Sequence, residues 1–187
     1  AQAAGIFLWI DMEYSSYVDR TLDVYKKVKG EFPNVGLAMQ AYLYRTEKDL
    51  EDLLAVKPTI RLVKGAYAEP PAVAFPKKSD VDANYLKLAT RLLVCVKEGK
   101  ANPPIFGTHD LALVKQLQAT AAGLGLDRKS YEVHMLFGIK RDDQRRLAES
   151  GTPVKVLISY GSAWFPWYMR RLAERPANVW FVVKSLF

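Results

Sequence analysis

The sequence has little cysteine and no long hydrophobic run. Its one cysteine, Cys95, excludes an internal disulfide and a cysteine-rich metal site. No apolar stretch reaches the roughly 18–20 residues that a membrane-spanning helix needs. We expect the short apolar run 179–183 to lie in a helix packed on the core, with contact to a membrane surface or to a partner as the alternative. The chain lacks the basic region of a signal peptide and an initiator Met, which suggests that it starts at a cut.

The sequence also lacks several short motifs of known chemistry. No Gly-x-Gly-x-x-Gly follows a predicted strand, and no Gly-Lys-Ser/Thr phosphate loop is present. The spacing of the two histidines does not suit zinc, and no Gly-x-Ser-x-Gly elbow provides a nucleophile. These absences argue against a Rossmann dehydrogenase, a P-loop enzyme, a zinc enzyme and a serine hydrolase.

The charge is positive but not concentrated. There are 27 basic and 20 acidic residues, giving a net charge of +7, and the basic residues are scattered singly or in pairs. This balance favours an anionic substrate, cofactor or surface over nucleic acid, which we do not expect as a partner. A basic module that binds nucleic acid or anionic lipid is the alternative. The 187 residues suit a single domain.

Short apolar runs alternate with helical patterns, which predicts a parallel sheet flanked by helices. The expected strands are 6–11, 35–40, 59–64, 104–108, 131–136 and 154–159. The first expected helix begins at Ser15 or Ser16 and ends before Gly30. Two more begin at capping boxes, one at Thr46 and one at Ser79, and a fourth begins at the cap Asp110. Further helices are expected over 141–150, from Pro166 to before Pro176, and over 177–187.

Polar residues follow the expected strands at their carboxyl ends, where barrel enzymes carry their chemistry. They are Asp11, Gln40, Lys64, Thr108, His109 and Tyr160. Arg61 lies inside an apolar strand, where an arginine needs an anionic partner or ligand. Each also has a plain structural interpretation: Asp11 as a helix cap, Gln40 as a loop hydrogen-bonder and Arg61 in a salt bridge. We expect His134, in mid-strand, to be a satisfied sheet residue.

A second cluster is Arg170, Arg171 and Glu174 on a predicted helix. The two arginines could both reach one carboxylate, and Glu174 could orient one of them through an i,i+3 or i,i+4 contact. A solvated helix face with ordinary ion pairs explains the same spacing.

Together these residues resemble the flavin-dependent proline dehydrogenase family, in its monofunctional bacterial form. The resemblance rests on Asp-Met-Glu at 11–13, Gln-Ala-Tyr-Leu at 40–43, Arg-Leu-Val-Lys-Gly-Ala-Tyr at 61–67, Thr-His at 108–109, Tyr-Gly at 160–161 and Arg-Arg-Leu-Ala-Glu-Arg-Pro at 170–176. It implies a (β/α)8 TIM-barrel-type fold of which about six βα units, strands three to eight, are present. Residues 1–187 then form one partial barrel domain.

The resemblance implies oxidation of L-proline to 1-pyrroline-5-carboxylate, with FAD as cofactor and a membrane quinone as electron acceptor. It implies a cytoplasmic protein with a peripheral contact at the inner membrane. The FAD-binding residues would be Met12, Gln40, Arg61, Val63, Lys64, Gly65, Ala66, Thr108, His109 and Glu174. Asp11 and Arg61 would be catalytic, and Arg170, Arg171, Leu157 and Trp167 would bind substrate.

Three departures from the family pattern qualify this implication. The first two strands of the barrel, with the family's substrate-binding lysine, are not in the sequence. Leu157 and Trp167 stand where many members carry tyrosine. A non-catalytic flavin-binding fragment, or a dehydrogenase of hydroxyproline or another cyclic imino acid, is therefore the alternative.

Overall fold

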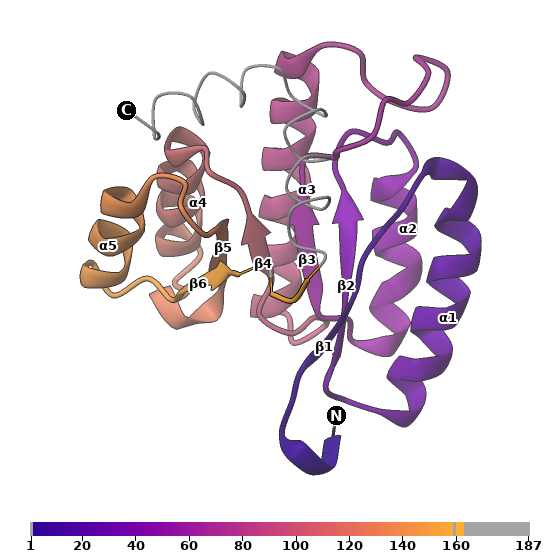
Figure 1. Cartoon of the computed structure of the whole chain (residues 1–187), viewed down its shortest axis with the longest axis horizontal. Coiled ribbons are helices and arrows are strands. Elements are labelled where there is room, and N and C mark those ends of the chain that lie inside the picture. The colour runs from indigo at the N-terminus through magenta and orange to yellow at the C-terminus, as the bar shows by residue number, and fades with distance from the viewer. Residues whose placement is uncertain (1, 159, 163–187) are drawn as a thin grey trace.

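A computed structural model describes residues 2–158 and 160–162. Its sheet has six parallel strands in the order of the chain: β1 (Leu8–Ile10), β2 (Val35–Gln40), β3 (Ile60–Val63), β4 (Ile105–Gly107), β5 (Glu132–Leu136) and β6 (Val154–Leu157). The sheet curls from β1 to β6 (Figure 1). All six predicted strands are confirmed, with ends trimmed by up to two residues.

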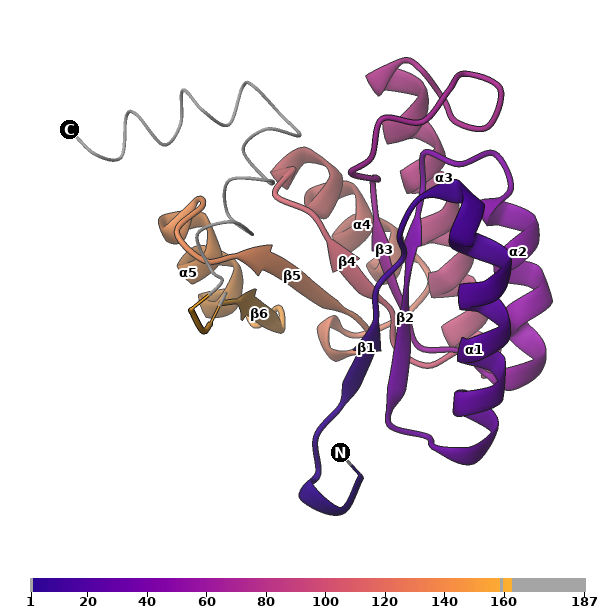
Figure 2. The same ribbon diagram turned by 45° about the vertical axis from the view of Figure 1, so that its right-hand side comes forward.

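Five helices connect the strands and lie on the outer side of the curl (Figure 2). They are α1 (Val18–Glu31), α2 (Thr46–Leu53), α3 (Lys78–Lys97), α4 (Leu111–Gly123) and α5 (Arg141–Glu149), with short 3-10 turns such as η2 (Ser15–Tyr17) before α1. Parallel neighbours joined by crossover helices produce an α/β sheet of the barrel type, which confirms the predicted fold class. The two helices expected beyond residue 162 lie outside the described residues.

The core lies between the sheet and the helices. Alternate side chains of a strand point to opposite faces, so that in β3 Ile60 and Leu62 are buried while Arg61 and Val63 are only partly covered. Helix residues such as Leu88 and Leu92 of α3 are buried in the same cluster. Tyr85, fully buried on α3, donates its hydroxyl proton to the Leu62 carbonyl at 3.2 Å, so burial leaves no unsatisfied phenol there.

Three predicted helix caps are wrong, because the hydroxyl groups form other contacts. Thr46 is buried and donates to the Gln40 carbonyl at 2.5 Å, so it closes the end of β2. Ser79 lies one residue inside α3 and contacts its neighbour Asp80 at 3.2 Å. Ser15 bonds to Glu69, 54 residues away. The predicted cap Asp110 is confirmed, since its carboxylate accepts from the backbone N–H of Ala112 and Leu113.

The predicted stop at Gly30 is also wrong, since α1 continues through it to Glu31. Phe32 is extended, with φ −131° and ψ 115°, and Pro33 follows it. A proline disfavours helical backbone in the residue before it, so Pro33 ends α1 where glycine was expected to. Gly99 and Gly151 do follow the ends of α3 and α5 with positive φ of 72° and 83°.

Candidate functional site

The polar strand-end residues described by the structure gather at one edge of the sheet, because all six strands are parallel. Three of them contact residues of another strand or strand-end loop. Asp11 after β1 pairs with Arg61 of β3, and Gln40 at the end of β2 donates to the Met12 carbonyl at 3.3 Å. His109, after β4, accepts at Nε2 from the backbone N–H of Leu136 at 2.8 Å. Asp11, Gln40 and His109 thus each follow or end a parallel strand at the same edge of the sheet.

Arg61 is the central cation of the inner face of the sheet. Its side chain is 16% exposed, and one guanidinium nitrogen contacts an Asp11 carboxylate oxygen. The guanidinium carbon lies 4.8 Å from the centre of the Trp9 ring. Its positive charge is thus held between an anion and an aromatic face, with Asp11 itself largely exposed. The salt-bridge interpretation of Arg61 is therefore confirmed.

Gln40 carries an unsatisfied polar atom. Its side chain is buried, its amide nitrogen donates to Met12, and its carbonyl oxygen has no hydrogen-bond partner among the described residues. Buried oxygens without a partner are uncommon and expensive. A hydrogen-bond donor placed against this oxygen would satisfy it. Met12 is itself buried.

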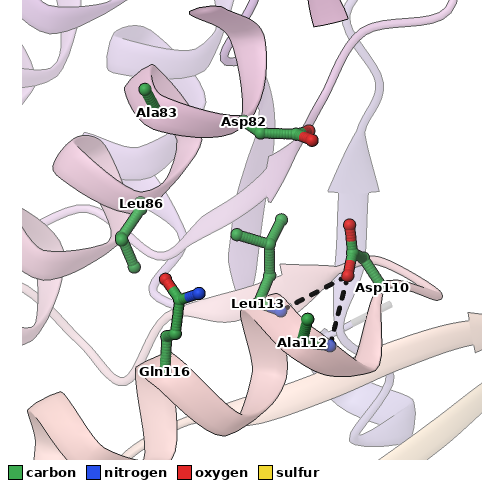
Figure 3. Close-up of a pocket in the computed structure, with 7 residues that line it drawn as sticks. All are labelled: Asp82, Ala83, Leu86, Asp110, Ala112, Leu113 and Gln116. Atoms are coloured by element: carbon green, nitrogen blue, oxygen red, sulfur yellow. Dashed lines mark hydrogen bonds between the residues drawn. The ribbon is translucent and has the colours of Figure 1, made fainter. Parts of the chain in front are cut away.

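Lys64 holds three elements together where β3 ends. Its ammonium lies 2.5 Å from Asp82 of α3 and 3.0 Å from Asp110 at the start of α4, and its side chain is 13% exposed. Figure 3 shows the two carboxylates beside a small groove between α3 and α4, lined also by Leu86, Leu113 and Gln116. Burial is the largest single influence and raises the pKa of both carboxyl groups. The hydrogen bonds and charges of Lys64 and Lys78, with the Leu113 N–H for Asp110, together outweigh burial and leave both pKa values below the ordinary range.

Gly65 lets the chain pass close to a tyrosine ring. Its φ is +120°, and a Cβ at this position would lie 2.4 Å from the Tyr42 ring. No side chain fits there without displacing Tyr42, which is buried. Ala66 follows in the same half-buried loop. The peptide run 64–66 is therefore held on both sides, by the ion pairs of Lys64 and by the ring of Tyr42.

The remaining predicted residues are placed as follows. Thr108 is buried, and its hydroxyl oxygen accepts from the Asp110 N–H at 3.1 Å. Val63 faces the same side of β3 as Arg61 and pairs with Gly107. Leu157 pairs with Leu136 in the β5–β6 register and is 51% exposed, whereas Tyr160 is 98% exposed and makes no part of the described cluster. Trp167, Arg170, Arg171 and Glu174 lie outside the described residues.

A second polar group lies further along the inner face. Glu132 contacts His134 at 3.0 Å and Lys155 at 2.9 Å, and His134 meets the edge of the Trp9 ring at 6.0 Å between centres. His134 is thus a satisfied sheet residue, as predicted. The hydrogen bond from His134, ahead of that from Lys155, lowers the pKa of Glu132 despite partial burial. Within residues 2–158 and 160–162, no cluster of metal-ligating side chains occurs.

Sequence reasoning missed Trp9, Asp82 and Glu69. Trp9 lies two residues before Asp11 in the expected strand 6–11. This period-2 spacing predicts the same face for both side chains and could have identified Trp9. Asp82 and Glu69 act through partners 18 and 54 residues away along the chain. No local pattern marks such contacts.

Comparison with known proteins shows which family the chain resembles over its whole length. The family model described as "Proline dehydrogenase" matches residues 1–184. Proline dehydrogenase 2 of Bacillus subtilis is 39% identical over 186 residues, which is all of this chain and 60% of that protein. Proline dehydrogenase of Deinococcus radiodurans is 40% identical over 188 residues and is covered to 59%. The chain thus spans about 60% of the length of these curated relatives.

Solved structures agree on the fold. Proline utilization A from Bdellovibrio bacteriovorus superposes with a TM-score of 0.82 at 24% identity, over 91% of this chain and 20% of that one. The curled parallel sheet and its polar carboxyl edge define the class: a barrel-type α/β protein with polar side chains at the strand ends. The chain belongs to the proline dehydrogenase family, whose members are flavoenzymes.

Proposed function

We propose that this protein oxidises L-proline to 1-pyrroline-5-carboxylate, transfers hydride to FAD and passes the electrons to a membrane quinone, as a step of proline catabolism. Membership of the family supports the reaction. The observation that carries the flavin assignment is the buried carbonyl oxygen of Gln40, which has no hydrogen-bond partner among the described residues. Gln40 pairs in register with Val63, two residues after the Arg61 cation on the same face of β3. A flavin ring offers both an N–H donor and a region that gains negative charge on reduction.

The described residues fit such a cofactor. Gln40 would accept from the ring, and the 64–66 backbone would lie along it, since Gly65 permits close approach. Met12, Val63, Thr108 and His109 would complete the pocket, with Glu174 as a further contact. FAD, when bound, supplies the hydride acceptor, and the protein positions the cofactor and the substrate relative to each other.

The substrate would be held by charge and shape. We propose that Arg170 and Arg171 bind the proline carboxylate bidentately, with Leu157 and Trp167 beside the ring. Arg61 would favour negative charge developing nearby, and Asp11 would hold Arg61 in place through their ion pair. Fixing the carboxylate orients the carbon next to nitrogen for hydride loss, which needs an amine without its extra proton.

The deciding experiment is a visible spectrum of the purified protein followed by anaerobic addition of L-proline. Flavin bands that bleach support the proposal. Bands that persist indicate a flavin-binding protein without turnover, and a folded but colourless protein contradicts the flavin assignment.

Arg171→Lys should raise the KM for proline about tenfold or more, because a planar guanidinium that can bind a carboxylate with two hydrogen bonds is replaced by a point charge. An unchanged KM contradicts the proposed carboxylate clamp.

Leu157 gives a second candidate substrate class. An exposed aliphatic side chain paired with Leu136 leaves more room than the tyrosine common in the family. We therefore propose hydroxyproline or another cyclic imino acid as the alternative substrate. The kcat/KM ratio for proline over hydroxyproline distinguishes the two, and Leu157→Tyr should raise that ratio.

A further inference from the structure

A bidentate hydrogen-bonded contact joins two loops at the carboxyl edge of the sheet. The backbone N–H of Ser15 donates to Glu69 Oε1 at 2.6 Å, and the Ser15 hydroxyl donates to Oε2 at 2.7 Å. Ser15 opens the turn η2 that leads into α1, and no residue near it in sequence caps that turn with a side chain. Glu69 therefore serves as its cap from 54 residues away.

The same two loops meet in two further contacts. The Tyr67 hydroxyl contacts the Glu13 carboxylate. The Tyr67 ring lies 4.2 Å from the Tyr14 ring, centre to centre. Residues 13–15 thus face residues 67–69 through a bidentate carboxylate, a phenol–carboxylate pair and an aromatic pair.

The loop between β3 and α3 reaches this position by lying across the loop that follows β2. The Tyr42 N–H donates to the Lys64 carbonyl at 2.9 Å, and the Phe75 N–H donates to the Tyr42 carbonyl at 2.8 Å. The Tyr44 ring packs edge-on against Phe75 at 4.6 Å. Burial raises the pKa of Tyr42, and the negative charge of Glu69 raises it further, which places that carboxylate near the buried phenol. In Figure 2 this loop stands above the carboxyl ends of the strands.

The joined loops carry residues that the proposed function assigns to the flavin. Met12 precedes Glu13, and Gly65 and Ala66 precede Tyr67. Neither loop has regular secondary structure between those residues and the contact. A fixed distance between the two short segments depends on the contacts that join them.

We propose that Glu69 is a positioning residue: by binding Ser15 it holds the 11–15 loop against the 64–69 loop, so that both walls of the flavin site have their final spacing before the cofactor arrives. This inference rests on the proposed function for its ligand. Glu13 supports the same arrangement through Tyr67. Preorganisation of this kind strengthens binding because ordering of the loops does not have to accompany it.

The first test measures FAD binding by fluorescence quenching. Glu69→Ala should weaken the Kd for FAD about tenfold, as expected for loss of charge-assisted hydrogen bonds. Ser15→Ala, which removes only the hydroxyl, should weaken it about threefold, and Glu69→Gln should fall between them. The matched control is Glu51→Ala, since Glu51 binds Arg91 in an equally bidentate contact between α2 and α3, at 2.6 and 2.8 Å. It should leave the Kd unchanged.

The second test needs no cofactor. In flavin-free protein, amide hydrogen exchange at Ser15 should accelerate about tenfold or more in Glu69→Ala, while exchange in α4 stays at its wild-type rate. Unchanged exchange at Ser15 overturns the inference. So does a wild-type Kd in Glu69→Ala, or an equal weakening in Glu51→Ala. A wild-type protein that binds no FAD overturns the proposed function instead, and is recognised by an intact exchange result.

Discussion

The two faces of this sheet use the same strands for different purposes. Toward the helices the strands present Leu37, Leu62 and Val133, each fully buried. Toward the inside of the curl they present Trp9, Arg61, Glu132, His134 and Lys155, joined in ion pairs and ring contacts. One face therefore supplies most of the apolar core, whereas the other carries the charged side chains, and the period of two along a strand assigns each residue to one face.

The largest effect on stability should come from the helix-facing side. Leu62→Ala should lower the free energy of unfolding by about 3–5 kcal/mol, because a wholly buried side chain leaves a cavity. Urea denaturation measures it. Val24→Ala on the exposed side of α1 is the control and should change stability by less than about 0.5 kcal/mol. Equal losses of unfolding free energy in Leu62→Ala and Val24→Ala would show that the buried face does not contribute more to stability than the exposed side of α1.

Next comes the rim where the two faces meet. Gly65→Ala should cost about 2–3 kcal/mol, since it combines a positive φ with a clash on Tyr42. Gly99→Ala shares the positive φ, at 72°, but has open space around it, so it should cost about 1 kcal/mol. Thermal unfolding of both variants separates backbone strain from overlap. If the two variants have the same melting temperature, the close contact with Tyr42 does not contribute to the destabilisation.

The ion pairs of Lys64 should contribute less, and in a pH-dependent way. Asp82→Asn should cost about 1–2 kcal/mol at pH 7. The folded-state pKa of Asp82 lies below its unfolded value, so this stabilisation is complete above the unfolded pKa of about 3.9 and is lost as pH falls through the folded value. Denaturation curves from pH 7 to pH 3 should therefore show the gap between wild type and variant closing. A constant gap would mean that the charge on Asp82 is irrelevant.

The smallest effect on stability should come from the inner face. Arg61→Leu should change the free energy of unfolding by less than about 1 kcal/mol, because its partner Asp11 is largely exposed. If the proposed function is correct, proline should bleach the flavin of the same variant far more slowly than that of the wild type. Stability by urea and bleaching by stopped flow test both halves. A large loss of stability in Arg61→Leu, with flavin bleaching at the wild-type rate, would show that the inner face contributes to stability and not to the reaction.

Much of the fold was predictable because it depends on local patterns. Apolar runs of 5–6 residues separated by helical periodicity located all six strands, and their alternation implied parallel pairing. The convergence of Asp11, Gln40 and His109 followed from that topology alone. Helix starts were less predictable, since Ser15 and Thr46 have hydroxyl groups suited to capping and use them on distant or strand-end partners instead.

The sequence by itself determined the class of fold, the edge at which polar residues collect and the motifs typical of the family. The tertiary structure decided which groups meet: Arg61 with Asp11 and Trp9, Lys64 with Asp82 and Asp110, and Ser15 with Glu69. The physical reason is range. Hydrophobic periodicity and turn chemistry act within a few residues, whereas a carboxylate finds its donor only after the strands between them have been brought side by side.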